Sequence, residues 1–286
     1  MIANGVLRRV DDAGPGGGAR AVRRSSLPAV VKLWPLLSLG ISLCVAGAGC
    51  SKAAPKPVPK QSVPAQRPVP FHPPYTIELP KADQRLGTAV VVLLDTSGSM
   101  NESVRDRSGG LRPKHEIARE ALEGILDYTN QWKQKKPDRV LELGIYRFSS
   151  SAHEVLPIGP FDFAKLQAAL RQIPRPGANT AIGDALEQGF KALYRTGCTR
   201  KFVVCITDGE NTAGNPPDYI ARILYEQTKG EVEIHFVAFD TSPQKFGFLA
   251  KVNGSVVEAA DGKQLQACLT DIYEKRILAE APPAEK

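Results

Sequence analysis

Short apolar runs alternate with longer amphipathic stretches through most of residues 86–280. The apolar runs are rich in Val, Ile and Phe, which favours strands, and they cover residues 89–95, 139–149, 152–158, 201–207, 232–239 and, more weakly, 255–259. The stretches between them carry apolar residues near helical spacing and cover residues 114–135, 163–172, 181–194, 217–229 and 263–278. The pattern therefore predicts strands and helices in alternation.

Alternation of this kind predicts a sheet with helices packed on both faces. The runs AVVVLLD (89–95) and KFVVCIT (201–207) are almost entirely apolar, as expected for central parallel strands that are buried on both sides. The runs at 139–149 and 152–158 are too close together for a crossover helix, so we expect them to form an antiparallel hairpin at an edge. The sequence thus predicts an α/β fold with a doubly wound, mostly parallel sheet and one antiparallel edge strand.

Hydroxyl and carboxyl side chains follow the two central strands. The first strand ends in Asp95-Thr-Ser97-Gly-Ser99, and Asp208 follows the second. Thr180 lies just before the helix predicted from residue 181. In doubly wound sheets, ligands bind at the carboxyl ends of the strands, near the point where the topology switches. We therefore expect these five side chains to lie close together at one edge of the sheet.

This set of oxygen atoms suits a hard divalent cation such as Mg²⁺, which keeps several waters in a six-fold shell. In an extended loop Ser97 and Ser99 point to the same side, and Gly98 between them gives the backbone the freedom that the turn needs. Because neutral hydroxyls make much of the direct contact, the ion would retain positive charge and an open position. An acidic side chain of a partner can fill that position, so the sequence predicts binding rather than hydrolysis.

The first motif resembles the DxSxS sequence of von Willebrand factor A domains and integrin inserted domains. Thr180 matches the threonine of the family's second loop, which is followed by G-x-A-L at residues 183–186, and Asp208 matches the aspartate of the T-D-G motif. The resemblance spans about residues 86–280. It implies a Rossmann-like fold, Mg²⁺ or Mn²⁺ as the ion, and adhesion to a protein ligand through an exposed Asp or Glu. It also implies a complete metal-ion-dependent adhesion site, with the metal ligands Asp95, Ser97, Ser99, Thr180 and Asp208.

Other roles for the same residues stay open on sequence alone. Asp95 and Ser97 are also typical helix-capping residues. A structural envelope scaffold would not need the ion. The fold also supports the metal-site subunit of ATPase-chelatase pairs, which work in the cytoplasm, so an export signal argues against that role. An enzyme is not expected, because the serines lack a G-x-S-x-G elbow and the histidines form no H-E-x-x-H or triad-like pattern.

Residues 1–50 have the features of an export signal. Basic residues precede an apolar run at 33–49 that is short and interrupted for a spanning helix, and small residues then lead into Cys50. This resembles the lipobox of bacterial lipoproteins, in which the cysteine is lipidated, although Gly47 stands where that pattern usually has an aliphatic residue. We expect a protein anchored in the bacterial cell envelope by a lipid on Cys50, facing the periplasm or the exterior. A secreted protein and an uncleaved membrane anchor are the alternatives.

Residues 51–85 are predicted to form a proline-rich stalk or linker. Prolines recur every few residues through much of this segment, a density that excludes helix and sheet and favours extended polyproline-type backbone. The A-type domain is predicted at residues 86–280, followed by a tail at 281–286. A stalk after a lipidated cysteine would lift the domain off the membrane, whereas a linker without a mechanical role is the alternative.

The formal net charge of +7 is concentrated outside the predicted domain. Residues 1–75 hold ten Lys and Arg but only two Asp and Glu, so the remainder of the chain is nearly neutral. Nucleic-acid binding therefore has little support and is not expected. Within the domain, the polar segment 100–113 is predicted to be a mobile loop. Its Arg105, Arg107 and Arg112 are solvated charges or, alternatively, a basic rim that steers acidic partners to the ion.

Three cysteines fall within the predicted domain. Cys198, Cys205 and Cys268 show no zinc-ligand spacing, so they predict no zinc site. Cys205 lies inside an apolar run and is expected to be a buried small residue rather than a reactive thiol. His235 alternates within a predicted strand and is expected to be packed.

Overall fold

The computed structural model describes residues 75–279. The predicted signal segment with Cys50, most of the predicted stalk and the tail at 281–286 lie outside the described residues. The strands of the main sheet are β1 (Arg85–Asp95), β4 (Leu141–Phe148), β5 (Ala152–Pro160), β6 (Cys198–Thr207), β7 (Val232–Phe239) and β8 (Gly254–Ala259). The longer helices are α1 (Lys114–Lys135), α2 (Phe163–Arg171), α3 (Ile182–Arg195), α4 (Pro217–Thr228) and α5 (Gly262–Ile272).

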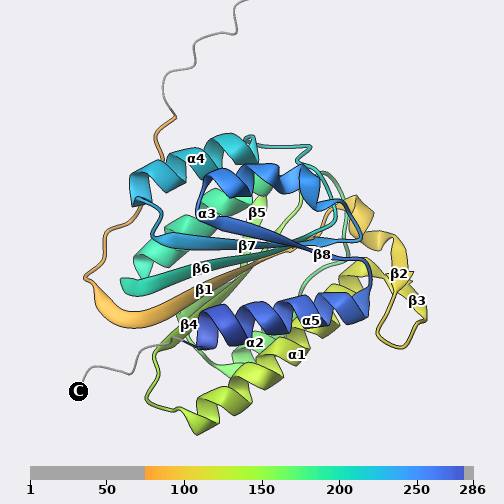
Figure 1. Ribbon diagram of the computed structural model, residues 1–286, viewed down its shortest axis with the longest axis horizontal. Coiled ribbons are helices and arrows are strands. Elements are labelled where there is room, and N and C mark those ends of the chain that lie inside the picture. The colour runs from red at the N-terminus through yellow and green to blue at the C-terminus, as the bar shows by residue number, and fades with distance from the viewer. Residues whose placement is uncertain (1–74, 280–286) are drawn as a thin grey trace, which may run out of the picture. The chain divides into compact units, whose positions relative to one another are not determined.

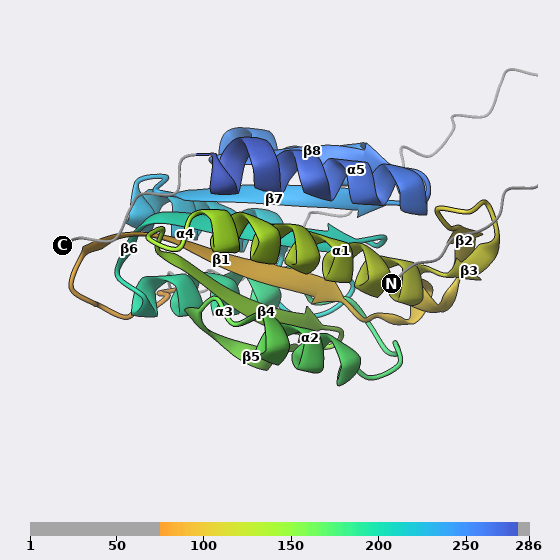
Figure 2. The ribbon, with the colours of Figure 1, turned by 90° about the horizontal axis from the view of Figure 1, so that it is seen from below.

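The sheet has the strand order β5-β4-β1-β6-β7-β8. All neighbouring pairs are parallel except β4 and β5, so the predicted doubly wound sheet with one antiparallel edge strand is confirmed. The chain leaves β1 toward β4 and β5 and later returns to β6 on the other side of β1, which puts the topological switch beside β1. The arrowheads of β1, β4 and β7 point to the same edge of the sheet (Figure 2).

Helices cover both faces of the sheet, as predicted. Helices α1, α2 and α5 lie on one face, and α3 and α4 lie on the other (Figure 1). Strand β1 contributes alternate residues to the two resulting cores: Val90 and Val92 pack with the first group of helices, whereas Val91 and Leu93 pack with the second. A central strand that is apolar on both sides is therefore what this three-layer arrangement requires.

The segment between β1 and α1 differs from the prediction of a mobile loop. It contains a short 3₁₀ helix, η1 (Gly98–Asn101), and an antiparallel hairpin of β2 (Ser103–Arg105) and β3 (Leu111–Pro113). Met100 and Val104 are buried, and the Asp106 carboxylate accepts hydrogen bonds from the backbone of Ser108 and Gly110 across the turn. These contacts order a segment whose composition alone favoured a loop.

The packed region also begins earlier than residue 86. Strand β1 starts at Arg85, and Ile77 is buried against the core on the α3 and α4 face. The Tyr75 hydroxyl donates to Glu187 Oε2 at 2.7 Å, and Gln227 Nε2 donates to the Ile77 carbonyl at 3.2 Å. Residues 75–85 therefore pack on the domain, although the sequence assigned them to the stalk.

Several smaller expectations concern buried residues. Cys205 is fully buried, as predicted, and Cys198, Cys205 and Cys268 are free thiols. His235 packs in the sheet layer with its ring stacked on Phe202. Within residues 75–279, no helix combines the length and the apolar character needed to cross a membrane.

Candidate functional site

The predicted site residues lie at the carboxyl edge of the sheet, beside the topological switch. Asp95 ends β1, and Asp208 directly follows β6 on the neighbouring strand. Ser97 Oγ and Ser99 Oγ are 3.1 Å apart, and Ser99 Oγ donates a hydrogen bond to Asp208 Oδ1 at 2.7 Å. The structure thus brings two hydroxyls and a carboxylate from separate loops together, as the sequence predicted.

Asp95 is the most deeply buried of these residues, with 0% of its surface exposed. Its Oδ1 accepts a hydrogen bond from the Ser97 backbone N–H at 2.7 Å, and its Oδ2 accepts one from the Thr207 hydroxyl at 2.6 Å. Burial raises the pKa of the Asp95 carboxyl to about 6, although these hydrogen bonds act in the opposite direction. At neutral pH the site therefore holds a carboxylate that is poorly solvated and would be stabilised by a nearby cation.

Thr180 reaches the same place from the loop before α3. The loop is fastened to the first motif by backbone hydrogen bonds from Gly98 N–H to Ala178 O and from Gly177 N–H to Thr96 O, at 3.0 and 2.9 Å. A methyl group built on Gly209 would lie 3.6 Å from Thr180 Oγ1 and 3.7 Å from Ser99 Oγ. The two hydroxyls therefore face the same small space in front of Gly209, which lacks a side chain to fill it.

The loop after β6 holds Thr180 from the other side. The Thr180 N–H donates to Thr212 Oγ1 at 2.9 Å, and the Thr180 carbonyl accepts from the Thr212 N–H at 2.8 Å. Asn211 Oδ1 accepts from the N–H of Ile182 at 2.7 Å, so it caps the start of α3. Asn211 and Thr212 were not singled out by the sequence, and their position three and four residues after Asp208 is the signal that could have found them.

The donor set fits a hard divalent cation. Its candidate ligands are all carboxylate or hydroxyl oxygens, and the Ser99 hydroxyl lies within hydrogen-bonding distance of both the Ser97 hydroxyl and the Asp208 carboxylate. Ser97 precedes η1 but makes no side-chain capping bond, so its hydroxyl is not used for capping. Over residues 75–279, His, Cys, Asp and Glu form no group of three or more suited to a metal, so any ion here depends on the hydroxyls.

Lys114 is a charged neighbour of the site that the sequence did not indicate. The amino group of Lys114, the first residue of α1, lies 3.0 Å from Asp208 Oδ2 and is almost completely buried. Burial by itself would lower the pKa of this amine, but its hydrogen bonds to Asp208, Asp240 and Glu102 outweigh that effect and raise the pKa. A lysine at the start of an amphipathic helix is usually solvated, so nothing in the neighbouring sequence indicated that Lys114 is buried at the site.

Two of the three arginines of the predicted basic rim have partners on the hairpin or on α1. Arg112 pairs with Glu120, at 2.6 Å, and also with Glu116 and Asp106. Arg105 donates to the Gly109 carbonyl within its own hairpin. The charge of Arg112 is therefore compensated by acids beside it, which favours the alternative of ordinary surface charges.

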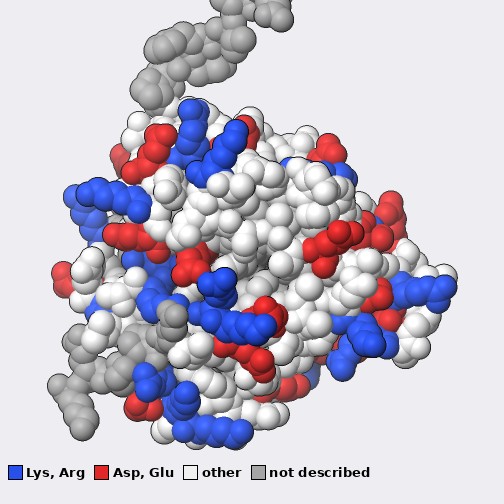
Figure 3. Space-filling view, viewed as in Figure 1, with Lys and Arg blue, Asp and Glu red and all other residues white. Residues whose placement is uncertain are grey.

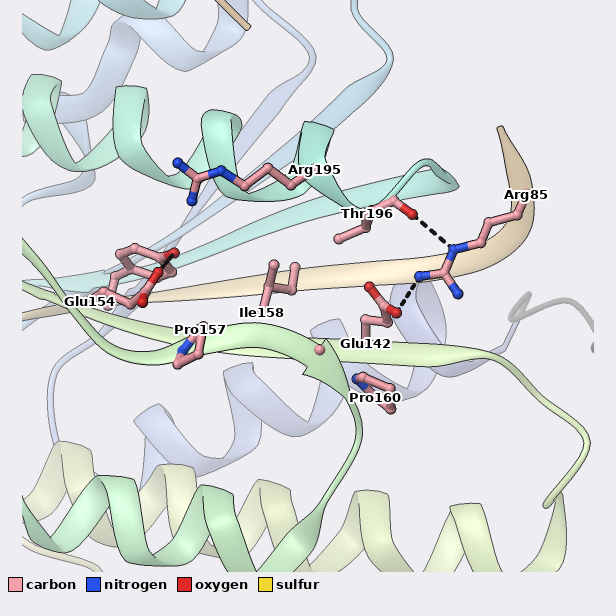
Figure 4. A pocket seen from close by; sticks show the side chains of 10 residues that line it. Arg85, Glu142, Glu154, Pro157, Ile158, Pro160, Arg195 and Thr196 are labelled. Carbon is pink, nitrogen blue, oxygen red and sulfur yellow. Dashed lines mark hydrogen bonds and ion pairs between the residues drawn. The ribbon is translucent and has the colours of Figure 1, made fainter. Parts of the chain in front are cut away.

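Pockets lie both close to the site and away from it. A groove of about 510 Å³ adjoins it, lined by Glu210 and Asn211 on one side and by Lys245, Phe246 and Phe248 of η2 (Pro243–Lys251) on the other. A smaller pocket of about 300 Å³ lies away from it, between the β4–β5 edge and the end of α3 (Figure 4). Within it, Arg85 pairs with Glu142, and the Tyr146 hydroxyl donates to Glu154. Glu210 and Asn211 belong to the loop that begins with Asp208, so the groove of about 510 Å³ lies next to that loop.

Comparisons with known proteins support the fold. Residues 90–210 match the family model described as the von Willebrand factor type A domain. The described domain has the von Willebrand factor A fold. One similar structure is a von Willebrand factor type A protein from Catenulispora acidiphila, with a TM-score of 0.52 and 19% identity over 66% of this chain and 42% of that chain. No curated protein sequence matches the chain.

Two other similar structures with this A-type fold are pilus proteins. The PilB minor pilin from Streptococcus sanguinis matches with a TM-score of 0.55 and 15% identity, over 71% of this chain and 64% of that chain. The pilus adhesin SpaC from Lactobacillus rhamnosus GG matches with a TM-score of 0.53 and 15% identity, over 70% of this chain and 32% of that chain. The chain therefore spans less than two thirds of these relatives, and at such identities the similarity shows the fold alone.

The surface charge of the A-type domain is mixed on the face that Figure 3 shows. Basic and acidic side chains are interspersed over it, and a broad uncharged area lies between them. A continuous basic surface of the kind that tracks a phosphate backbone is not seen there.

Proposed function

We propose that this chain is an exported, envelope-anchored bacterial protein whose A-type domain binds a protein partner in a divalent-metal-dependent way. The observation that carries the proposal is the convergence of Ser97, Ser99 and Asp208 at the carboxyl edge of the sheet, next to the buried Asp95. Binding is completed by an exposed Asp or Glu of the partner. Mg²⁺ is the expected ion, with Mn²⁺ as an alternative.

The five residues would divide the work of holding the ion. Ser97, Ser99 and Thr180 offer hydroxyl oxygens, whereas Asp95 and Asp208 balance charge, directly or through water. When bound, the ion would supply a positive centre with an open position for a carboxylate oxygen. The fixed loops keep these oxygens together before binding, which lowers the ordering cost of assembling the site.

The surroundings of the hydroxyls support binding rather than catalysis. His115 Nδ1 lies 3.1 Å from the Met100 carbonyl, His153 Nε2 lies 2.9 Å from Ser151 Oγ, and His235 Nδ1 lies 2.8 Å from Ser255 Oγ. The three described histidines thus have partners other than Ser97 and Ser99. Ser99 donates instead to the Asp208 carboxylate, which also pairs with Lys114, and this arrangement of a hydroxyl and a carboxylate suits the holding of a cation.

The envelope location rests on the sequence and on the comparisons together. A basic segment, an apolar run and Cys50 are expected to export and anchor the chain, and the proline-rich segment then separates the anchor from the domain. Two of the similar structures are a minor pilin and a pilus adhesin, which fits a role in adhesion or assembly outside the cytoplasm.

A capture experiment tests the partner. The immobilised full chain is expected to retain a partner from an envelope extract of the producing bacterium in Mg²⁺ and to release it in chelator, because the carboxylate contact needs the ion. Asp208→Asn should abolish retention, since the substitution removes a charge that would balance the ion. The matched control is Ser103→Ala, an exposed position on the neighbouring hairpin, which should retain the partner normally.

A partner that stays bound in chelator and to Asp208→Asn would favour the scaffold alternative. In that case the A-type domain would bind through another surface, and the metal proposal for the interaction would be wrong. Loss of the partner in chelator but not in Asp208→Asn would contradict the assigned ligand set.

A further inference from the structure

Lys114 is a buried cation in an unfavourable place. Its side chain is 3% exposed, and it lies at the first position of α1, where the helix dipole disfavours positive charge. Removing an ammonium group from water costs several kcal/mol unless it is paired and fully hydrogen-bonded. A lysine held here therefore needs strong compensation from its neighbours.

The compensation comes from three carboxylates in three different segments. Lys114 Nζ lies 3.0 Å from each of Asp208 Oδ2, Asp240 Oδ2 and Glu102 Oε2. The Asp208 side chain is 0% exposed, whereas those of Asp240 and Glu102 are 43% and 69% exposed. Water screens the last two, so the pair with Asp208 is the strong one.

Lys114 and the Ser99 hydroxyl contact different oxygens of the Asp208 carboxylate. Asp208 Oδ1 accepts from Ser99 Oγ at 2.7 Å, and Asp208 Oδ2 accepts from Lys114 Nζ at 3.0 Å. The amine therefore leaves the oxygen that faces Ser99 in place while it neutralises the group. The Lys114 ammonium group therefore partly neutralises Asp208, as a bound cation would.

The backbone fixes the amine and its partners. The Lys114 N–H donates to the Glu102 carbonyl at 2.9 Å, which joins the start of α1 to the turn after η1. Asp240 follows β7 with a left-handed φ of 51°, a conformation that costs energy for a residue other than glycine, and its N–H donates to the Ala259 carbonyl at 2.8 Å. Three loops around the site thus converge on one ammonium group.

We propose that Lys114 is a fixed cation that holds Asp208 in place when no divalent ion is bound and competes electrostatically with the ion for this carboxylate. The second part rests on the proposed metal binding. Two consequences follow. The site stays assembled without metal, and the ion binds less tightly but keeps more of its positive charge for an acidic partner.

The first part is tested without metal, by thermal unfolding of the full chain in chelator. Lys114→Met should lower Tm by about 5 °C or more, because it leaves Asp208 buried and unpaired. In an Asp208→Asn background the same substitution should cost less than half as much, since the carboxylate that needs the cation is gone. Lys165→Met, an exposed lysine, is the control for charge loss alone and should leave Tm nearly unchanged. Equal losses in both backgrounds would overturn the proposal, because Lys114 would then act through packing or through Asp240 and Glu102.

The second part is tested by titrating Mg²⁺ alone into the same proteins by calorimetry. Lys114→Met should bind Mg²⁺ about tenfold more tightly than the unaltered chain, because a competing positive charge has been removed. A lysine that merely supports the structure would give weaker binding when removed, so unchanged or weaker binding overturns the competition. If the unaltered chain and Lys114→Met both bind no Mg²⁺, the proposed function and the competition fail together, whereas the chelator experiment still decides whether Lys114 holds Asp208.

Discussion

Replacing Asp95 with asparagine is expected to abolish divalent-metal binding and, in the metal-free protein, to raise the free energy of unfolding at pH 7 by about 2–3 kcal/mol. The Asp95 carboxyl is fully buried, and its pKa of about 6 lies above the ordinary value of 3.8. At pH 7 the folded domain therefore holds an anion that the unfolded chain accommodates more easily. Asparagine keeps the acceptor for the Ser97 N–H and removes the charge, and the Thr207 hydroxyl turns to accept from the new amide instead of donating to a carboxylate.

The stability gained by Asp95→Asn is expected to depend on pH. A carboxyl whose pKa is raised on folding destabilises the protein above that pKa, and the penalty disappears as pH falls toward the unfolded value. The gain from Asp95→Asn should therefore be full at pH 7 and shrink between about pH 6 and pH 4. Urea unfolding in chelator at several pH values measures it.

Asp106→Asn is the matched control for this measurement. The Asp106 carboxylate accepts hydrogen bonds from Ser108 and Gly110, and the Ser108 hydroxyl is the main cause of its lowered pKa. Asp106→Asn should lower rather than raise the free energy of unfolding at pH 7. If Asp95→Asn were less stable than the unaltered chain at pH 7 in chelator, the claim that the buried Asp95 carboxylate destabilises the folded domain would be wrong.

Replacing Gly183 with alanine is expected to lower the free energy of unfolding by about 3 kcal/mol. Helix propensity alone predicts the opposite, a gain of about 1 kcal/mol, because glycine in a helix is unfavourable. A Cβ on Gly183 would lie only 2.1 Å from the Asn215 carbonyl oxygen, so the loop after β6 would have to move away from α3. That loop holds Thr180 through Thr212, so metal binding should weaken as well.

Gly189→Ala in the same helix is the control for Gly183→Ala. Its Cβ would lie 3.4 Å from Leu93 Cδ2, a contact with the end of a side chain, so the expected change is within about 1 kcal/mol. Urea unfolding of both variants measures the difference. A Gly183→Ala variant as stable as Gly189→Ala would show that the 209–215 loop is free to shift.

The main elements were predictable because packing and local pattern agree. Strands β1 and β6 are apolar on both faces, since helices cover both, and that pattern is visible in sequence. The close approach at Gly183 also explains in physical terms why the G-x-A-L sequence begins with glycine. Asp95, Ser97 and Ser99 lie at the end of β1, and the fold places β6, which leads to Asp208, beside β1.

The missed features depend on contacts between distant parts of the chain. Ile77 lies among prolines, so its burial against the domain has no periodic signal. Strands β2 and β3 have three residues each, too few for an alternating pattern to appear. Lys114 is separated by 94 residues from Asp208, and nothing near it in sequence distinguishes it from a solvated lysine. These positions gain their meaning only from the folded surroundings.

The central claim is that Asp95, Ser97, Ser99, Thr180 and Asp208 hold one divalent ion. Electron paramagnetic resonance of Mn²⁺ titrated into the metal-stripped full chain tests it most directly, because free and bound Mn²⁺ differ in their spectra. We predict one bound Mn²⁺ per chain, displaced by Mg²⁺ and lost in both Ser99→Ala and Asp208→Asn. Absence of a stoichiometric site in the unaltered chain, or an equal site in both variants, would contradict the account.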